Sequence, residues 1–257
     1  MRSELIKFDF ADARDRMTAA AIAIVLVAIW EVAARAGWIN TLLFPRPSHI
    51  AAALASLARH DLTNNVLITI GRLLAGLALG AVPGVILGLV IGTSPRVHRI
   101  IDPFIAAIHP LPKIVLFPLF IVIFGIGEWA KVSSIALTVF FPTLINAAAG
   151  ARQISPLYHE VIRNYGGTRA ARFRHVVIPG SLPMILNGIR VAVNLGLLVT
   201  VAMEFTVVSP GIGSIIWLAL QTMRIDQLYA GIVIISLIGI TLNVPIQWLL
   251  RRTARWQ

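Results

Sequence analysis

His159 and Glu160 open a segment that could belong to a zinc enzyme. The zinc motif His-Glu-x-x-His places two imidazoles on one face of a helix and a general base between them. Here the position of the second histidine holds Arg163, so one imidazole ligand is missing. The other histidines show no spacing that would complete a ligand set; they are His49, His60, His98, His109 and His175. We therefore expect no metal on this chain.

The residues for other reactions are missing as well. The chain has no cysteine, which excludes a thiolate nucleophile and a disulfide. None of the three lysines, Lys7, Lys113 and Lys131, follows a glycine-rich GxxxxGK[ST] loop, and no GxSxG motif occurs. The chain itself is expected to bind no nucleotide or other cofactor, so work done with ATP would need another subunit. An enzyme embedded in the membrane remains the alternative class, through a motif of another kind.

Any site has to be positioned by the apolar segments that make up most of the sequence. Of the 257 residues, 58% are hydrophobic and 13% are charged. Several runs approach the ~20 residues that cross a bilayer, and they lack the alternation of a strand. Because only helices and closed barrels satisfy the backbone in lipid, we predict an all-α integral membrane protein. Six transmembrane helices are expected at residues 18–36, 66–92, 103–125, 132–150, 183–204 and 227–249.

Basic residues are distributed unevenly around these spans. Of the 22 lysines and arginines, 14 fall on the side that holds both termini. The other side holds four, namely Arg46, Arg59, Lys131 and Arg224, and the spans hold four, namely Arg35, Arg72, Lys113 and Arg190. Cytoplasmic segments carry the excess of positive charge, so both termini and the loop at 151–182 are predicted to be cytoplasmic. Residues 1–17 would be an N-terminal tail and residues 18–257 one transmembrane domain. The net charge of +11 then reflects topology, and lipid rather than nucleic acid is the expected contact.

Glycines recur at every fourth position of the second span, from Gly76 to Gly92. A stripe of small residues lets another helix approach closely. We predict that this stripe packs against a helix of the same chain, with a dimer contact as the alternative. Pro83 lies within the stripe and should bend the helix.

Four prolines interrupt the third span, at positions 103, 110, 112 and 118. Each removes a backbone donor and collides with the preceding turn, so the span must be broken or kinked. Irregular backbone at membrane depth is tolerated where it is buried in protein or faces water, which makes Pro110 and Pro112 candidates for a translocation path. Lys113 follows them; it would either line a route for an anion or extend to the cytoplasmic surface.

A lone carboxylate, Glu204, ends the otherwise uncharged second half of the fifth span. An ionisable residue within a span is a candidate for function, so Glu204 joins the predicted path. The alternatives are that it reaches the outer interface or pairs with Arg72 or Arg35. Residues 209–213 predict a turn, and the apolar run 214–220 is too short to cross the membrane. We expect this run to fold back as a partial-depth helix over the outer mouth.

The basic loop between the fourth and fifth spans carries a recognisable pattern. It reads EVIRNYGGTRAARFRHVVIP from Glu160 to Pro179, with Gly166 six positions after the glutamate. This resembles the cytoplasmic EAA signature of permease subunits of bacterial ABC importers, which is Glu-Ala-Ala, three residues, Gly, nine residues, then aliphatic-x-aliphatic-Pro. Val161 and Ile162 replace the two alanines. The segments FPRPSHI, PLPKIVLFPLFIVIFGIG, VAMEF and PGIGSII are similar to the taurine, aliphatic sulfonate and nitrate branch of these permeases.

The resemblance implies a type I ABC importer-like fold and several partners. These would be a second copy of the chain, two cytoplasmic ATPase subunits that hold ATP and Mg²⁺, and an extracytoplasmic solute-binding protein, assembled in the bacterial inner membrane. The loop would form a helix-turn-helix seated in a cleft of the ATPase. Its glycines permit a sharp turn, its proline ends the element, and its charged side chains offer contacts to a soluble partner. The predicted coupling residues are Glu160, Gly166, Gly167, Arg169, Arg172 and Pro179.

The transported solute is then expected to be a small anion or zwitterion, such as a sulfonate, taurine or nitrate. An importer of an unrelated small organic solute is the alternative. An exporter would be expected to lack the EAA pattern.

Overall fold

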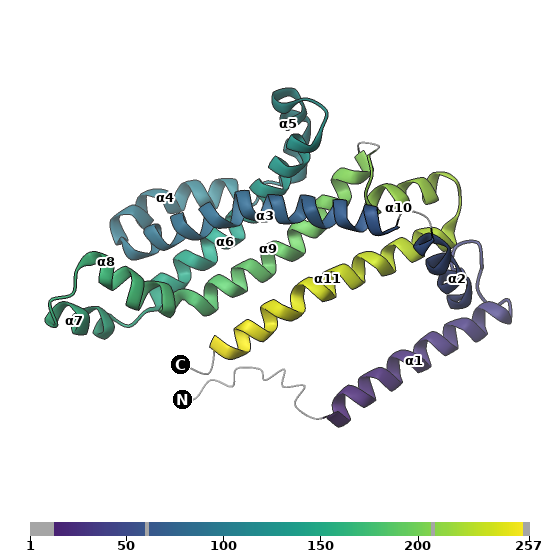
Figure 1. Cartoon of the computed structure of the whole chain (residues 1–257), viewed down its shortest axis with the longest axis horizontal. Helices are drawn as coiled ribbons and strands as arrows, with labels where there is room; N and C mark the ends of the chain where they lie inside the picture. The colour runs from purple at the N-terminus through teal and green to yellow at the C-terminus, as the bar shows by residue number, and fades with distance from the viewer. Residues whose placement is uncertain (1–12, 60–61, 207–208, 254–257) are drawn as a thin grey trace.

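All regular elements of the computed structural model are helices in the residues that it describes, which are 13–59, 62–206 and 209–253 (Figure 1). The elements are α1 (Ala13–Arg35), α2 (Pro47–Ala58), α3 (Leu62–Thr93), α4 (Pro95–Ile108), η1 (Lys113–Leu116), α5 (Phe117–Phe124), α6 (Glu128–Gln153), α7 (Pro156–Asn164), α8 (Arg169–Arg172), η2 (Phe173–Val177), α9 (Ile178–Thr206), α10 (Ile212–Gln221) and α11 (Ile225–Thr253). The predicted all-α fold class is confirmed. Most of the predicted N-terminal tail, residues 1–12, lies outside the described residues.

Within the described residues, five helical segments are long and apolar enough to cross a membrane. They are Met17–Arg35, Leu62–Thr93, Glu128–Gln153, Arg169–Thr206 and Ile225–Thr253. A sixth candidate consists of α4 and the η1–α5 segment, which meet at an angle of 81°. Pro110 and Pro112 lie in the break between them, where a continuous helix would lack their backbone donors. The predicted break of the third span is therefore confirmed.

The centre of the molecule is the contact between α3 and α6. A Cβ atom added at any of the five stripe glycines, from Gly76 to Gly92, would overlap atoms of α6. Leu73, Ile135 and Val139 are fully buried beside this contact. The prediction of a packing seam within the chain is confirmed, and α6 leaves these five positions no room for a second copy. Pro83 lies inside α3, which continues through it as one helix.

Four long helices, α3, α6, α9 and α11, lie alongside one another (Figure 1). Gly150 of α6 packs against Ser181 and Met184, and Gly188 of α9 packs against Asn146 and the carbonyl of Pro142. These pairs show that α6 and α9 run antiparallel. The α7–α8 segment lies at one end of the four helices, and α10 lies at the other end (Figure 1). The bundle therefore carries α7–α8 and α10 at opposite ends.

Two elements extend away from this bundle. Helix α1 is mostly exposed and is fastened near its C-terminal end, where Trp30 stacks on Tyr229 with ring centroids 6.0 Å apart. The backbone amide of Ser48 donates to Glu31 at 3.0 Å. Helix α5 projects from the side of the bundle (Figure 1). Val122 in this helix and Ile126 just after its end are both exposed.

Pro179 does not end an element, which corrects the expectation for the coupling loop. It is the second residue of α9, and α8, the π-helical turn η2 and α9 follow one another without a gap. A proline cannot donate to the carbonyl four residues earlier, and the wider π turn before it accommodates this loss. The second half of the predicted loop is thus a helical extension of the fifth span.

Candidate functional site

The turn between α7 and α8 is built around two glycines. Helix α7 begins at Ser155, whose hydroxyl accepts from the amide of Leu157, with Pro156 in its first turn. At its end the amide of Gly167 donates to the carbonyl of Ile162 at 2.8 Å, and the amide of Gly166 donates to Arg163 at 3.0 Å. This is a Schellman motif, in which the residue after the cap is left-handed. Gly166 has φ +71°, so the sharp turn expected at the two glycines is present.

Helix α8 begins directly after this turn. The hydroxyl of Thr168 accepts from the amide of Ala171 at 3.2 Å and caps α8. A side chain on Gly167 would collide with Ile162, so α7 and the start of α8 pack closely. Because α8 continues through η2 into α9, a force applied to the turn acts directly on a membrane span.

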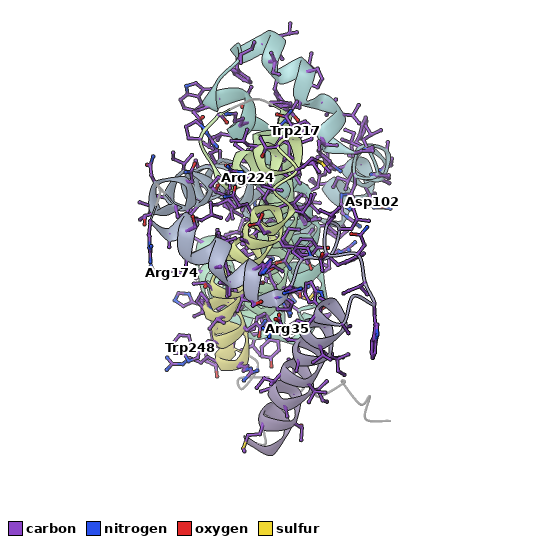
Figure 2. The ribbon with its side chains drawn as sticks, turned by 90° about the vertical axis from the view of Figure 1, so that its right-hand side faces the viewer. Arg35, Asp102, Arg174, Trp217, Arg224 and Trp248 are labelled. Atoms are coloured by element: carbon purple, nitrogen blue, oxygen red, sulfur yellow. The ribbon has the colours of Figure 1, made fainter. Side chains whose placement is uncertain are left out.

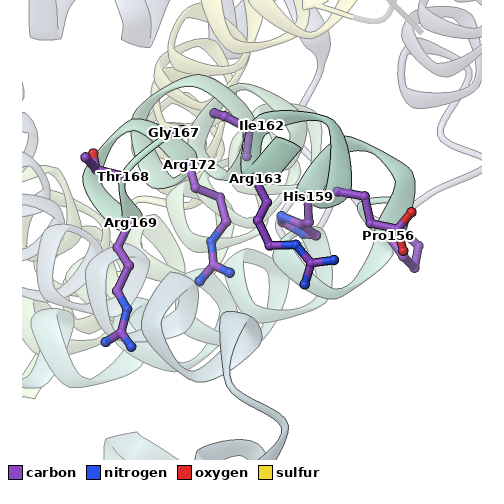
Figure 3. Close-up of a pocket in the computed structure, with 9 residues that line it drawn as sticks. Pro156, His159, Ile162, Arg163, Gly167, Thr168, Arg169 and Arg172 are labelled. Carbon is purple, nitrogen blue, oxygen red and sulfur yellow. The ribbon is translucent and has the colours of Figure 1, made fainter. Parts of the chain in front are cut away.

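A cleft of about 420 Å³ opens between α7 and α8. The side chains of Arg163, Arg169 and Arg172 point to the same side of this segment (Figure 3). Glu160 lies on the wall of the same cleft, and it has no ion pair among the described residues. The cleft is lined by Pro156, His159, Glu160, Ile162, Arg163, Gly167, Thr168, Arg169 and Arg172. It offers one carboxylate and several guanidinium groups to whatever docks there.

The structure brings together four of the six predicted coupling residues at this cleft, namely Glu160, Gly167, Arg169 and Arg172. Gly166 forms the adjoining turn. Pro179 lies elsewhere, on a second hollow that Tyr158 and His175 also line.

The path candidate Lys113 lies at the elbow between α4 and α5. Its ammonium group donates to the carbonyl of His109 and lies 5.0 Å from the centre of the Phe141 ring. Phe141 is close to the middle of α6, so Lys113 is held beside the centre of the bundle. Pro110 and Pro112 form the elbow itself.

The path candidate Glu204 is buried and paired. Its carboxylate accepts from Arg72 at 2.7 Å, from the amide of Gly213 at 2.8 Å and from the hydroxyl of Thr69 at 2.9 Å. Of the two arginines considered as partners, the structure has Arg72, while Arg35 bonds Glu31 within α1 at 2.6 Å. The predicted short helix over residues 214–220 is α10, and its N-terminus is fastened to Glu204.

Arg72 connects Glu204 to a larger polar cluster. Its guanidinium makes two bonds of 2.6 Å to Glu128 and one of 2.6 Å to the carbonyl of Pro210. Lys131 donates to Glu128 at 3.3 Å and to the hydroxyl of Ser209 at 2.6 Å. The cluster ties the turn before α10 to α3, α6 and α9.

Sequence reasoning missed the part of this cluster on α6. Lys131 was counted among the basic residues outside the spans, but it is buried within α6. The signal was available, because Glu128 and Lys131 stand at positions i and i+3, the spacing of a helical ion pair. The predicted start of that span at residue 132 separated them from the helix.

These helices, with a helix-turn-helix at one end, define a multi-pass membrane permease. Residues 84–256 match the family described as binding-protein-dependent transport system inner membrane component, and the chain belongs to this family. It is the permease subunit of an ABC importer, in the branch that includes taurine, sulfonate and nitrate permeases. The family is one of transport system components.

Individual relatives are similar over most of their length. The chain is 34% identical to the putative aliphatic sulfonates transport permease protein SsuC of Escherichia coli (strain K12) over 232 residues, covering 90% of this chain and 88% of that protein. It is 29% identical to the taurine transport system permease protein TauC of the same organism, covering 90% and 86%. A structure of the MetNI methionine ABC transporter matches with a TM-score of 0.64 at 19% identity, covering 75% of this chain and 95% of that one. This match confirms the type I importer-like fold.

Proposed function

We propose that two copies of this chain form the pore of an ATP-driven importer for a small organic sulfonate or a related anion in the bacterial inner membrane. Two ATPase subunits on the cytoplasmic side bind ATP and Mg²⁺ and hydrolyse the nucleotide, and an extracytoplasmic protein delivers the solute. The observation that carries the proposal is the cleft between α7 and α8. It is lined by charged side chains, and the α7–α8 segment lies at one end of the bundle (Figure 1).

The cleft suits a soluble partner because its charged side chains form no ion pair with any residue that the structure describes. Glu160 is exposed, and the arginines across the cleft point to one side (Figure 3). Charge-assisted hydrogen bonds of this kind are strong when a partner excludes water from them. Closure of the ATPase pair would carry α7 and α8 with it and, through η2, would move α9. Such a movement would shift the importer between outward-open and inward-open states.

The solute class rests on two different arguments. The relatives with the highest identities given above are permeases for sulfonates and taurine. Lys113 also supplies a cation beside the break of the third span, where an anion could pass. An unrelated organic solute remains the second candidate, and solute competition in the uptake assay below distinguishes the two.

The proposal is tested by substitutions that should fail in different ways. Glu160→Lys is expected to release the ATPase during purification, because losing one side of a buried charged contact costs roughly 2–5 kcal/mol. Gly166→Val is expected to keep the ATPase but lose solute-stimulated hydrolysis, because φ +71° strains a β-branched residue. Gly166→Asn is the control, since asparagine tolerates this conformation. Co-purification, ATPase activity and uptake of labelled taurine in vesicles would be measured for the complete importer.

Wild-type values for both Glu160→Lys and Gly166→Val would show that the loop does not couple to an ATPase. Uptake that excess alkanesulfonate or nitrate fails to inhibit would instead remove the proposed solute class while leaving the coupling role intact.

A further inference from the structure

An exposed polar stripe crosses the middle of α9. Asn187, Arg190 and Asn194 are all exposed in the chain. At about 100° per residue, these three positions fall within an arc of roughly 60° on one face of the helix. The opposite face of α9 is packed, with Ala192 and Gly196 buried against the bundle. The stripe is therefore a surface of the helix that the rest of this chain leaves open.

Asparagines of the two neighbouring helices border the stripe. The amide of Asn187 donates to Asn146 of α6 at 3.1 Å. The amide of Asn243 of α11 donates to the carbonyl oxygen of Asn194 at 2.7 Å. The polar surface thus runs from α6 across α9 to α11, and its residues belong to three different spans.

Some hydrogen-bonding groups of the stripe have no partner among the described residues once these contacts are made. Arg190 has no ion pair with any residue that the structure describes. Asn194 uses its carbonyl oxygen for Asn243, which leaves its NH₂ group available as a donor. The other amide oxygen in the pair, that of Asn243, is buried without a partner among the described residues. Arg190 and Asn194 together present unused donors on one open surface.

The stripe lies at the depth of the hydrocarbon core. Helix α9 has 29 residues and is about 44 Å long, against ~30 Å of hydrocarbon. Arg190 is two residues from the middle of α9, so it lies within about 3 Å of that middle along the axis. Asn146 and Asn243 are likewise within six residues of the middle of α6 and α11.

Lys113 lies at a similar level. Gly188 of α9 packs against Pro142, and Gly196 packs against Val139, so Phe141 lies opposite the turn of α9 that contains Arg190. The Lys113 ammonium is 5.0 Å from the Phe141 ring. Two cations from different spans are therefore held near the middle of the bundle.

A stripe of this kind is expensive when it faces lipid. A charged side chain at the bilayer centre costs at least ~2.5–3.5 kcal/mol, and such residues almost always face a water-filled cavity or the interior of a bundle. With ~15 Å of hydrocarbon on either side, Arg190 is too deep to reach an interface easily. Because the open side of the stripe is polar along three spans, we expect it to face a water-filled cavity, which a second copy of the chain would close off from lipid.

We propose that Arg190, with Asn187 and Asn194, forms a binding site for an oxoanion group in the middle of the translocation path. The proposal rests on the import function proposed above and specifies where that solute binds. A guanidinium group donates two parallel hydrogen bonds to the oxygens of a sulfonate or a nitrate, and the free amide of Asn194 adds a further donor. An exposed guanidinium in a hydrated path binds weakly enough to release its ligand.

The first test is access of water to the stripe, and the cysteine-free chain makes it direct. Asn194→Cys in the complete importer should react with the anionic reagent sulfonatoethyl methanethiosulfonate. The matched control is Val25→Cys, an exposed position near the middle of α1, which should stay unreactive because it faces lipid. Equal reactivity at the two positions would overturn the proposal.

The second test asks whether Arg190 selects for negative charge. The rate at which Asn194→Cys reacts is measured with the anionic reagent and with its cationic trimethylammonium analogue. Each rate is divided by the rate of Tyr165→Cys, a position outside the spans, with the same reagent. The anionic rate is then divided by the cationic rate. This ratio should fall by about tenfold in Arg190→Gln, while Arg190→Lys should retain part of it. An unchanged ratio in Arg190→Gln would show that Arg190 is not at the site.

Uptake separates failure of this site from failure of the import function. Arg190→Gln should reduce uptake of labelled taurine and of labelled methanesulfonate at least tenfold without loss of the ATPase, and Arg224→Gln, outside the spans, should not. If the wild-type importer carries neither probe, the proposed solute is wrong, while the cysteine tests still decide on the stripe. If wild type and Arg190→Gln carry the probes equally, the import function stands and the site is wrong.

Discussion

The contribution of an ion pair to the stability of this chain depends on how deeply its side chains are buried. Glu204 and Glu128 both bind Arg72, but the Glu204 side chain is fully buried and that of Glu128 is 58% exposed. Removing one partner of a buried ion pair costs ~3–5 kcal/mol, whereas an exposed pair contributes ~0–1 kcal/mol. The two carboxylates therefore provide a matched comparison around one arginine.

We expect Glu204→Gln to lower the thermal stability of the purified protein in detergent far more than Glu128→Gln does. The loss also frees the amide of Gly213 from its ionised acceptor, so the turn before α10 should become accessible to proteases in Glu204→Gln. Unfolding midpoints and limited proteolysis of both variants would be compared. Equal midpoints would mean that the cluster is no more than a surface ion pair. The carboxylate of Glu204 accepts from three groups of this chain, which explains its structural role. Its role in the translocation path stays a prediction.

Helix contacts depend on positions where no side chain fits. At Gly80 of α3 an added Cβ would overlap the carbonyl of Ala136 in α6, and backbone atoms cannot move aside as a flexible side chain can. Gly71, on the same helix, has nothing within 4 Å of the corresponding position. Alanine also has the higher helix propensity, by ~1 kcal/mol, so propensity alone would favour both substitutions.

Gly80→Ala should therefore destabilise the protein by ~1–3 kcal/mol through overpacking, and Gly71→Ala should leave it unchanged or slightly more stable. Denaturation in mixed detergent would measure both, with expression level as a second readout. A stabilised Gly80→Ala would contradict the close contact of α3 and α6.

At the scale of the whole molecule, the two ends of the bundle must lie on opposite sides of the membrane. Tyr165, in the turn after α7, and Met223, between α10 and α11, are both strongly exposed and lie at opposite ends (Figure 1). The distribution of basic residues predicts that the end with Tyr165 is cytoplasmic. Exposed arginines occur towards both ends, because Arg174 lies in η2 and Arg224 lies between α10 and α11; Figure 2 labels both. Side-chain charge near the ends alone is therefore a weaker guide than the count over all loops.

Tyr165→Cys and Met223→Cys should be labelled by an impermeant thiol reagent from opposite sides of sealed vesicles. Met223→Cys should react in intact spheroplasts, and Tyr165→Cys only after the membrane is opened. The cysteine-free parent chain serves as the blank. Labelling of both positions from one side would contradict the predicted topology.

The sequence by itself determined the class of this protein. Long apolar runs permit only a few backbone structures in lipid, and the spacing from Glu160 through Gly166 to Pro179 can be recognised because it lies within one loop. It also predicted the broken third span, because each proline forbids a specific hydrogen bond within its own helix. Local chemistry of this kind can be read without knowing which helices meet.

Contacts between distant segments were decided only by the tertiary structure. The pairing of Arg72 with Glu204 joins residues 132 positions apart, and sequence reasoning left Arg35 as an equal partner because composition does not say which helices are neighbours. The same limit applied to Lys131, which was placed outside the spans, and to Arg190, which was counted within a span without a role. Which face of a helix is buried depends on the helices that pack against it, and in this chain that packing covers one side of α9 and leaves Asn187, Arg190 and Asn194 open.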